Sequence, residues 1–157
     1  MRIAVVSDTH GNYKEVLRAL ERQDKFDMLF HLGDYVDDGE KLKKILSIPT
    51  IIVKGNGDYW SDYNEDEIIE IKGKKILVTH GHRYNVRFNY TSLYYKGLEL
   101  KADIVLFGHT HVPLNIKENN LIIMNPGSPS LPRSQDRKKT FGIIEIGDRI
   151  KTEIVEI

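Results

Sequence analysis

Residues 3–11 read Ile-Ala-Val-Val-Ser-Asp-Thr-His-Gly, an apolar run that ends in an aspartate, a histidine and a glycine. The run is rich in β-branched residues and too short for a helix, which is typical of a strand buried on both faces. Asp8 and His10 are two residues apart, and in an extended segment such side chains point to the same side. This stretch therefore predicts a core strand that brings two metal-binding groups to its carboxyl end.

Four further apolar runs repeat this arrangement, and they are Met28–Phe30, Ile51–Val53, Ile76–Val78 and Ile104–Phe107. Each run is followed by glycine and by polar side chains that bind metals. These segments are His31-Leu32-Gly33-Asp34, Gly55-Asn56-Gly57-Asp58, Thr79-His80-Gly81-His82 and Gly108-His109-Thr110-His111. Ligand sites in open α/β sheets form where strands end. If the strands share one direction, the five loops meet at one edge.

The segments between these runs predict helices and hairpins. Helical periodicity covers residues 13–22, with Asn12 as the N-cap, and residues 40–46 and 90–101. Expected antiparallel pairs are 66–71 with 75–79, 112–117 with 121–125, and 141–146 with 149–157. The pattern predicts one α/β domain over residues 1–157, with either a mixed sheet or two packed sheets and the helices outside.

Composition excludes several classes of protein. The chain has 157 residues, and its 23 Lys and Arg balance 23 Asp and Glu. The composition therefore lacks the excess of basic residues that is typical of nucleic-acid-binding proteins. No apolar run is long enough for a signal peptide or a membrane span, so we expect a cytoplasmic protein without a membrane partner. The chain has no cysteine, so any metal must be bound by nitrogen and oxygen donors.

The loops together hold more metal-binding groups than one four-coordinate ion needs. The groups are Asp8, His10, Asp34, Asn56, His80, His109 and His111. They suit two divalent transition-metal ions with one carboxylate between them. Manganese is the expected metal, with nickel, iron and zinc as alternatives, because mixed imidazole and carboxylate donors accept all four.

The order of these motifs resembles that of the calcineurin-like metallophosphoesterases, in particular the small single-domain phosphodiesterases of bacteria and archaea. The matching motifs are Asp8-Thr9-His10, Gly33-Asp34, Gly55-Asn56, His80-Gly81 and Gly108-His109-Thr110-His111. The resemblance spans the chain from Asp8 to about Arg133. It implies a four-layer αββα sandwich, with two mixed β-sheets flanked by helices.

The resemblance also implies a role for each ligand. Asp8, His10 and His111 would hold a first ion, and Asn56, His80 and His109 would hold a second. Asp34 would bridge the two ions.

Two ions about 3.5–4 Å apart lower the pKa of a shared water, and the hydroxide then attacks phosphorus in line. The expected function is hydrolysis of a small phosphodiester or phosphomonoester, with Asp34, Asn56 and His82 as the catalytic residues. Two alternatives remain. The first is a protein-binding scaffold of this fold, as in a retromer subunit with degenerate metal motifs. The second is a nuclease of the same superfamily, which the neutral and short chain disfavours.

Some polar and aromatic residues near these motifs allow two interpretations. We expect His31 to be packed and hydrogen-bonded inside the second strand, and Asp58 to lie in a turn or behind a ligand. Residues Asn125–Ser128 either form part of the site or only end a strand. Arg133 is either a phosphate-binding residue or a surface arginine. Residues Trp60–Tyr63 are a plausible self-association contact, which would make the protein a homo-oligomer.

One position departs from the family pattern and generates a prediction. Many members carry a histidine after the Gly-Asn asparagine, and it protonates the leaving group, whereas this chain has Gly57. His82 or a metal-bound water could supply that proton instead. We expect nitrophenyl phosphodiesters, whose leaving groups need little protonation, to turn over faster than alkyl phosphodiesters. Steady-state kinetics on matched aryl and alkyl esters measures this, and equal rates in a chemistry-limited reaction would contradict it.

Overall fold

The computed structural model describes residues 1–157 as ten strands, three α-helices and one short 3₁₀-helix, residues His82–Tyr84. The strands form two five-stranded sheets. The first sheet has the order β10 (Ile150–Glu156), β9 (Thr140–Ile146), β1 (Arg2–Val6), β2 (Met28–His31) and β3 (Thr50–Ile52). The second has the order β4 (Asp66–Ile71), β5 (Lys74–Thr79), β6 (Ile104–Leu106), β8 (Leu121–Asn125) and β7 (Leu114–Glu118).

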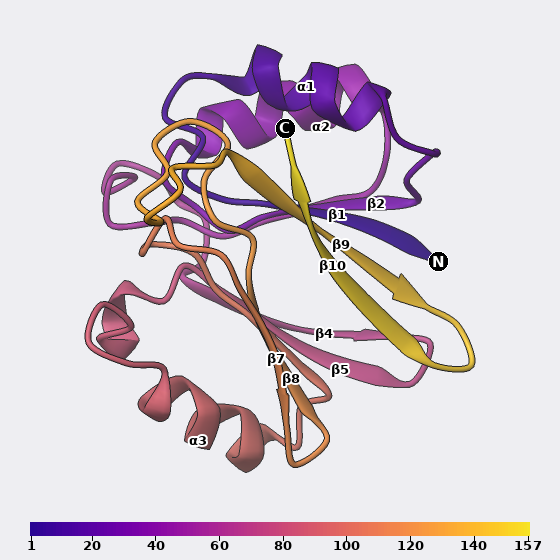
Figure 1. Ribbon diagram of the computed structural model, residues 1–157, viewed down its shortest axis with the longest axis vertical. Coiled ribbons are helices and arrows are strands. Elements are labelled where there is room, and N and C mark those ends of the chain that lie inside the picture. Colours follow the sequence, from indigo (N-terminus) through magenta and orange to yellow (C-terminus); the bar gives the residue numbers. More distant parts are fainter.

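The helices lie outside the two sheets and complete four layers (Figure 1). Helices α1 (Tyr13–Glu21) and α2 (Val36–Leu46) cover the first sheet, and α3 (Thr91–Leu100) covers the second. Of the two arrangements left open by the strand pattern, the chain adopts the packed pair of mixed sheets. The α/β sandwich expected from the sequence is confirmed.

The apolar run of β1 shows why these short strands form the core. Ile3 and Val5 pack between the sheets, whereas Ala4 and Val6 face α1 and α2, and all four side chains are fully buried. Burial of one such aliphatic side chain stabilises the fold by about 1.5–3 kcal/mol. A strand covered on both faces has no polar side, so the run is continuously apolar.

Strand direction brings the polar loops together. Strands β1, β2 and β3 are parallel in the first sheet, and β5, β6 and β8 are parallel in the second. The loops that follow these strands gather on one side of the sandwich, on the left in Figure 1. The five loops therefore come from two sheets and meet where the ends of both sheets adjoin.

Two helix starts differ from their expected form. Helix α2 begins at Val36, four residues before the expected start, because the distant carboxylate of Asp58 accepts the N–H groups of Tyr35 and Val36. Asn12 is the N-cap residue of α1, but its side chain donates to the Ser130 hydroxyl and caps no helical N–H. Neither partner is close in sequence to the helix it affects.

The glycine within α3 has a packing role. A Cβ at Gly97 would lie 2.7 Å from Val105 Cγ2 and 2.8 Å from Leu121 Cδ2, so glycine lets the helix approach β6 and β8 closely. None of the helices is long and apolar enough to span a membrane.

Candidate metal centre

Asp8, two residues after the end of β1, lies at the centre of the gathered loops. Its side chain is fully buried, and its Oδ2 accepts from the Ser7 hydroxyl at 2.6 Å and from the His109 N–H at 3.0 Å. Its Oδ1 is buried without a hydrogen-bond partner and lies 3.1 Å from His111 Nε2. One oxygen is therefore fixed by the protein, and the other faces a group of histidines.

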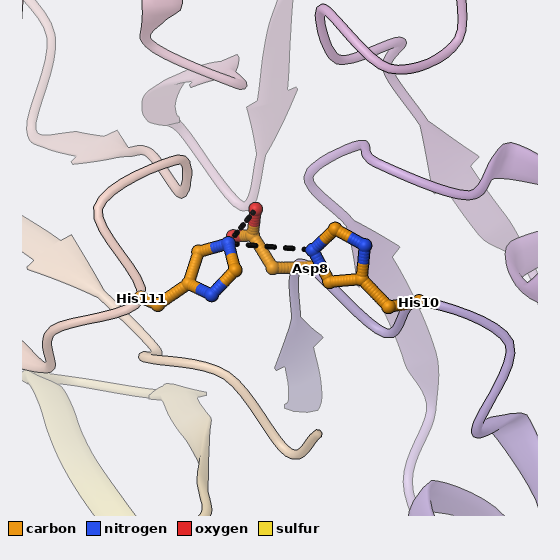
Figure 2. A group of neighbouring side chains, drawn as sticks. All are labelled: Asp8, His10 and His111. Carbon is orange, nitrogen blue, oxygen red and sulfur yellow. Dashed lines mark hydrogen bonds and ion pairs between the residues drawn. The ribbon is translucent and has the colours of Figure 1, made fainter. Parts of the chain in front are cut away.

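The first group of potential ligands consists of Asp8, His10 and His111, which point toward one another in Figure 2. The His10 and His111 Nε2 atoms are 3.3 Å apart. His111 Nδ1 donates to the Leu131 carbonyl at 2.6 Å, which leaves the Nε2 lone pair directed at Asp8. Three donors thus converge from two loops.

The second group consists of Asp8, Asp34 and His80. His80 Nε2 lies 3.5 Å from Asp34 Oδ1 and 4.0 Å from Asp8 Oδ1. His80 Nδ1 donates to the Leu32 carbonyl at 2.8 Å, so its Nε2 also faces the centre. His109 Nδ1 is 3.2 Å from His80 Nε2, which adds a second imidazole on this side.

The donor set fits divalent metal ions. A buried carboxylate oxygen without a partner is costly unless a positive charge compensates it, and Asp8 Oδ1 is such an atom. Carboxylate and imidazole donors together suit first-row transition ions. Asp8 belongs to both groups in this geometry, whereas the sequence resemblance assigns the bridging position to Asp34.

The charges in the centre shift the pKa values of its residues. Burial alone would raise the pKa of Asp8, but its close contact with His111 and the electrostatic attraction of His80 hold that pKa below its usual range. Burial alone would lower the pKa of His111, but the contact with Asp8 raises it. Burial lowers the pKa of His109 to about 4, and the charge of His80 acts in the same direction.

The loop that carries Asn56 is held against Asp34. The Gly57 N–H donates to Asp34 Oδ1 at 2.8 Å, and a Cβ at Gly55 would overlap the same oxygen. Glycine on both sides of Asn56 therefore allows the loop to touch the carboxylate. The Asn56 side chain itself is exposed, and its role as a ligand remains a prediction.

His82 lies at the edge of the centre. Its ring centroid is 5.5 Å from that of His80 and 6.1 Å from that of His109, and its Nε2 lies 3.8 Å from Glu65. Its Nδ1 is buried without a hydrogen-bond partner. The structure places His82 beside the second group but does not test its role as a proton donor.

Side chains of residues 125–128 form hydrogen bonds to two loops of the site. Asn125 Nδ2 donates to the Gly108 carbonyl at 2.7 Å, and Ser128 Oγ donates to the Asp8 carbonyl at 2.9 Å. These contacts hold the first and fifth loops, so the segment does more than end a strand. Arg133 is exposed, and its backbone N–H donates to the His111 carbonyl at 3.1 Å.

Two supporting residues were missed in the sequence. Ser7 binds Asp8 through its hydroxyl, and Asp38 Oδ2 accepts the Gly11 N–H at 2.8 Å. Ser7 could have been found in the sequence, because it is a hydroxyl residue between the apolar run and Asp8. Asp38 lies in a run of charged residues on α2, so nothing in its surroundings distinguishes it from a solvated helix face.

His31 connects the loop of Asp8 with the loop of Asp34. It is fully buried, its Nδ1 accepts the Gly33 N–H at 3.3 Å, and its Nε2 lies 3.1 Å from Thr9 Oγ1. The expectation of a packed, hydrogen-bonded histidine is confirmed. With Nδ1 as the acceptor, Nε2–H donates to Thr9, so the ring is neutral.

Comparison with known proteins identifies the family. The model of the calcineurin-like phosphoesterase superfamily domain matches residues 1–149. The chain belongs to this superfamily. It is 32% identical over 147 residues to the probable metallophosphoesterase YsnB of Bacillus subtilis, and the match covers 93% of this chain and 85% of YsnB. It is 29% identical over 147 residues to phosphodiesterase MJ0936 of Methanocaldococcus jannaschii, with coverage of 81% and 83%.

Solved structures agree with this assignment. A predicted phosphoesterase from Streptococcus pneumoniae superposes with a TM-score of 0.83 at 35% identity, covering 99% of this chain and 88% of that one. Wild-type Vps29 of Entamoeba histolytica, complexed with Zn²⁺, superposes with a TM-score of 0.80 at 23% identity, covering 99% of both chains. The second likeness concerns the fold alone.

The neutral state of His31 predicts a pH dependence of stability. Burial lowers its pKa from 6.5 to about 4, so the unfolded chain binds an additional proton between these pH values and the folded protein loses stability as the pH falls through them. At pH 5 the loss from this group is about 2 kcal/mol relative to pH 7.5. Urea unfolding of metal-free wild type and His31→Gln at both pH values measures it. The variant should show a correspondingly smaller loss, and an equal loss in both proteins would contradict the assignment.

Proposed function

We propose that the protein is a dinuclear metal-dependent phosphodiesterase. Membership of the calcineurin-like superfamily supports a phosphoesterase, and the two groups of donors around Asp8 support two metal ions. Manganese is the metal we expect, with nickel, iron and zinc as alternatives.

The observation that carries the proposal is the state of Asp8 Oδ1. This buried oxygen has no hydrogen-bond partner, and it lies 3.1 Å from His111 Nε2 and 4.0 Å from His80 Nε2, so it faces both donor groups. A single cation beside His10 and His111 would compensate it, but would leave Asp34 and His80 converging 3.5 Å apart on the other side. Two ions would compensate the Asp8 oxygen and would also explain why Asp34 and His80 converge.

We assign the proposed ligands to two ions. Asp8, His10 and His111 would hold the first ion, Asn56, His80 and His109 would hold the second, and Asp34 would contribute between them. The Leu32 and Leu131 carbonyls fix the tautomers of His80 and His111, so both present Nε2 without a rearrangement. When bound, two divalent ions supply an activated water for in-line attack and charge to stabilise the phosphoryl oxygens.

A phosphodiester fits the surroundings of the centre. The relative named phosphodiesterase MJ0936 supports this class of substrate. Arg133 is exposed next to His111, and Arg87 is exposed on the side of His109 and contributes to lowering its pKa after burial and His80. Cationic side chains on both sides of the centre would attract a substrate with a negative charge.

Hydrolysis assays with and without metal test the proposal. The metal-free protein should not hydrolyse bis-nitrophenyl phosphate, and Mn²⁺ should restore turnover. His80→Ala and Asp34→Asn should each lower kcat/KM by about 100-fold or more, because each removes a proposed ligand. Glu153→Gln, at an exposed carboxylate on β10 outside these loops, is the matched control and should keep wild-type turnover.

A protein-binding scaffold is the competing outcome. Absence of hydrolysis with Mn²⁺, Ni²⁺, Fe²⁺ and Zn²⁺, for both phosphodiesters and phosphomonoesters, would overturn the enzymatic proposal and favour the scaffold.

A further inference from the structure

Asp58 is a fully buried carboxylate that the proposed reaction does not use. Its Oδ1 accepts the N–H groups of Tyr35 at 2.8 Å and Val36 at 3.1 Å, and its Oδ2 accepts the Gly55 N–H at 2.9 Å. All three partners are backbone donors, and two of them lie at the start of α2. A negative charge at a helix N-terminus is stabilised by these N–H groups and by the helix dipole.

These contacts set Asp58 apart from the metal ligands. Both of its oxygens are occupied by N–H donors, and it belongs to neither group of converging ligands. Charge-assisted bonds from backbone N–H groups satisfy the carboxylate without a cation. Its position is therefore explained by the backbone segments that it joins.

The joined segments carry two proposed metal ligands. Tyr35 directly follows Asp34, and Gly55 directly precedes Asn56, so the carboxylate spans the two loops just behind these side chains. Tyr35 has a left-handed backbone with φ 76°, a conformation that a bulky residue rarely adopts without external support. Asp58 supplies that support, and the Gly57 N–H to Asp34 Oδ1 closes the same unit.

We propose that Asp58 is a positioning residue that holds Asn56 and Asp34 at the spacing required to bind the second metal ion. The inference rests on the two-ion function proposed above. Support of this kind behind a ligand typically changes metal affinity by about 10–100-fold.

The substitution Asp58→Asn separates positioning from simple packing. Asparagine has the same shape, but its NH₂ group would face an N–H donor at one end, so it can accept from the Tyr35 side or from Gly55 but not from both. The bridge between the two loops is then lost, although the cavity stays filled.

Asp103 offers a matched control at the opposite end of the second sheet, before β6. Its Oδ2 accepts one backbone N–H, from Lys75 at 2.9 Å, and its Oδ1 faces the Lys74 ammonium at 3.3 Å. An asparagine here can keep its oxygen toward Lys75. Asp103→Asn should therefore leave the Asp34 and Asn56 loops unchanged.

The test is Mn²⁺ binding by calorimetry, together with electron paramagnetic resonance of the bound ions. Wild type should bind two Mn²⁺ that are magnetically coupled. Asp58→Asn should bind one equivalent about 10–100-fold more weakly and, at loading that saturates wild type, should show an isolated ion. Raising the Mn²⁺ concentration should restore both the coupling and hydrolysis. Asp103→Asn should retain two coupled ions.

Comparison with a second variant assigns the effect to one ion. In the His109→Ala background, where the second ion is already weakened, Asp58→Asn should weaken the remaining ion less than it weakens the second ion of the wild type, because Asp34 but not Asn56 would contact that ion. Thermal unfolding of each variant shows that it is folded at the temperature of the titration. If Asp58→Asn does not fold, Asp58→Glu keeps both acceptor oxygens on a longer stem and should weaken the same ion.

Two results would overturn the inference. One is wild-type affinity for both ions in folded Asp58→Asn and Asp58→Glu. The other is an equal weakening in Asp103→Asn, which would indicate a general loosening of the fold. A wild-type protein that binds two ions without hydrolysing any phosphoester would contradict the proposed enzyme but not the role of Asp58. Fewer than two bound ions in wild type would contradict both.

Discussion

The buried carboxylate of Asp8 is the constraint to which the surrounding structure responds. Three other segments of the chain touch this residue: Gly33 accepts its N–H, Ser128 donates to its carbonyl, and the fifth loop contacts its two carboxylate oxygens through His109 and His111. An isolated charge in the protein interior costs several kcal/mol, and one oxygen of this carboxylate has no hydrogen-bond partner. The loops therefore collect positive and metal-binding groups around a negative charge that the hydrophobic core brings to that position.

The backbone of the loops is strained where the proposed ligands lie. Asp8, His10, Asp34, His109 and His111 all have positive φ values, between 45° and 65°. Such conformations cost about 1–3 kcal/mol each outside glycine, although aspartate and histidine tolerate them better than most residues. Contacts from other loops, rather than local preference, must hold these conformations. Three buried side chains provide such contacts. His31 joins the first and second loops, Asp38 joins α2 to the first loop, and Asp58 joins the start of α2 to the third loop.

The elements could be predicted from the sequence because their signals are local. A fully buried strand such as β1 requires a continuous apolar run, and β4 and β8 coincide with their expected ranges. The order of Asp and His groups after the strands also singled out the carboxylates and imidazoles that lie close together in the structure. The sequence did not predict whether the strands form one mixed sheet or two packed sheets. Each strand is covered on both faces in either case, so its sequence is continuously apolar in both.

The supporting contacts could not be predicted because they are non-local. Asp58 acts on Tyr35 from 23 positions away, and Ser128 acts on Asp8 from 120 positions away. Sequence periodicity carries no information on pairs of this separation. The early start of α2 and the side-chain partner of Asn12 differ from expectation for the same reason.

Anomalous scattering from Mn²⁺-soaked crystals of the wild-type protein tests the central claim most directly. We expect two peaks about 3.5–4 Å apart, one within bonding distance of Asp8, His10 and His111 and the other next to His80 and His109. A single peak, two peaks too far apart to share a ligand, or no peak among these side chains would contradict a two-ion centre.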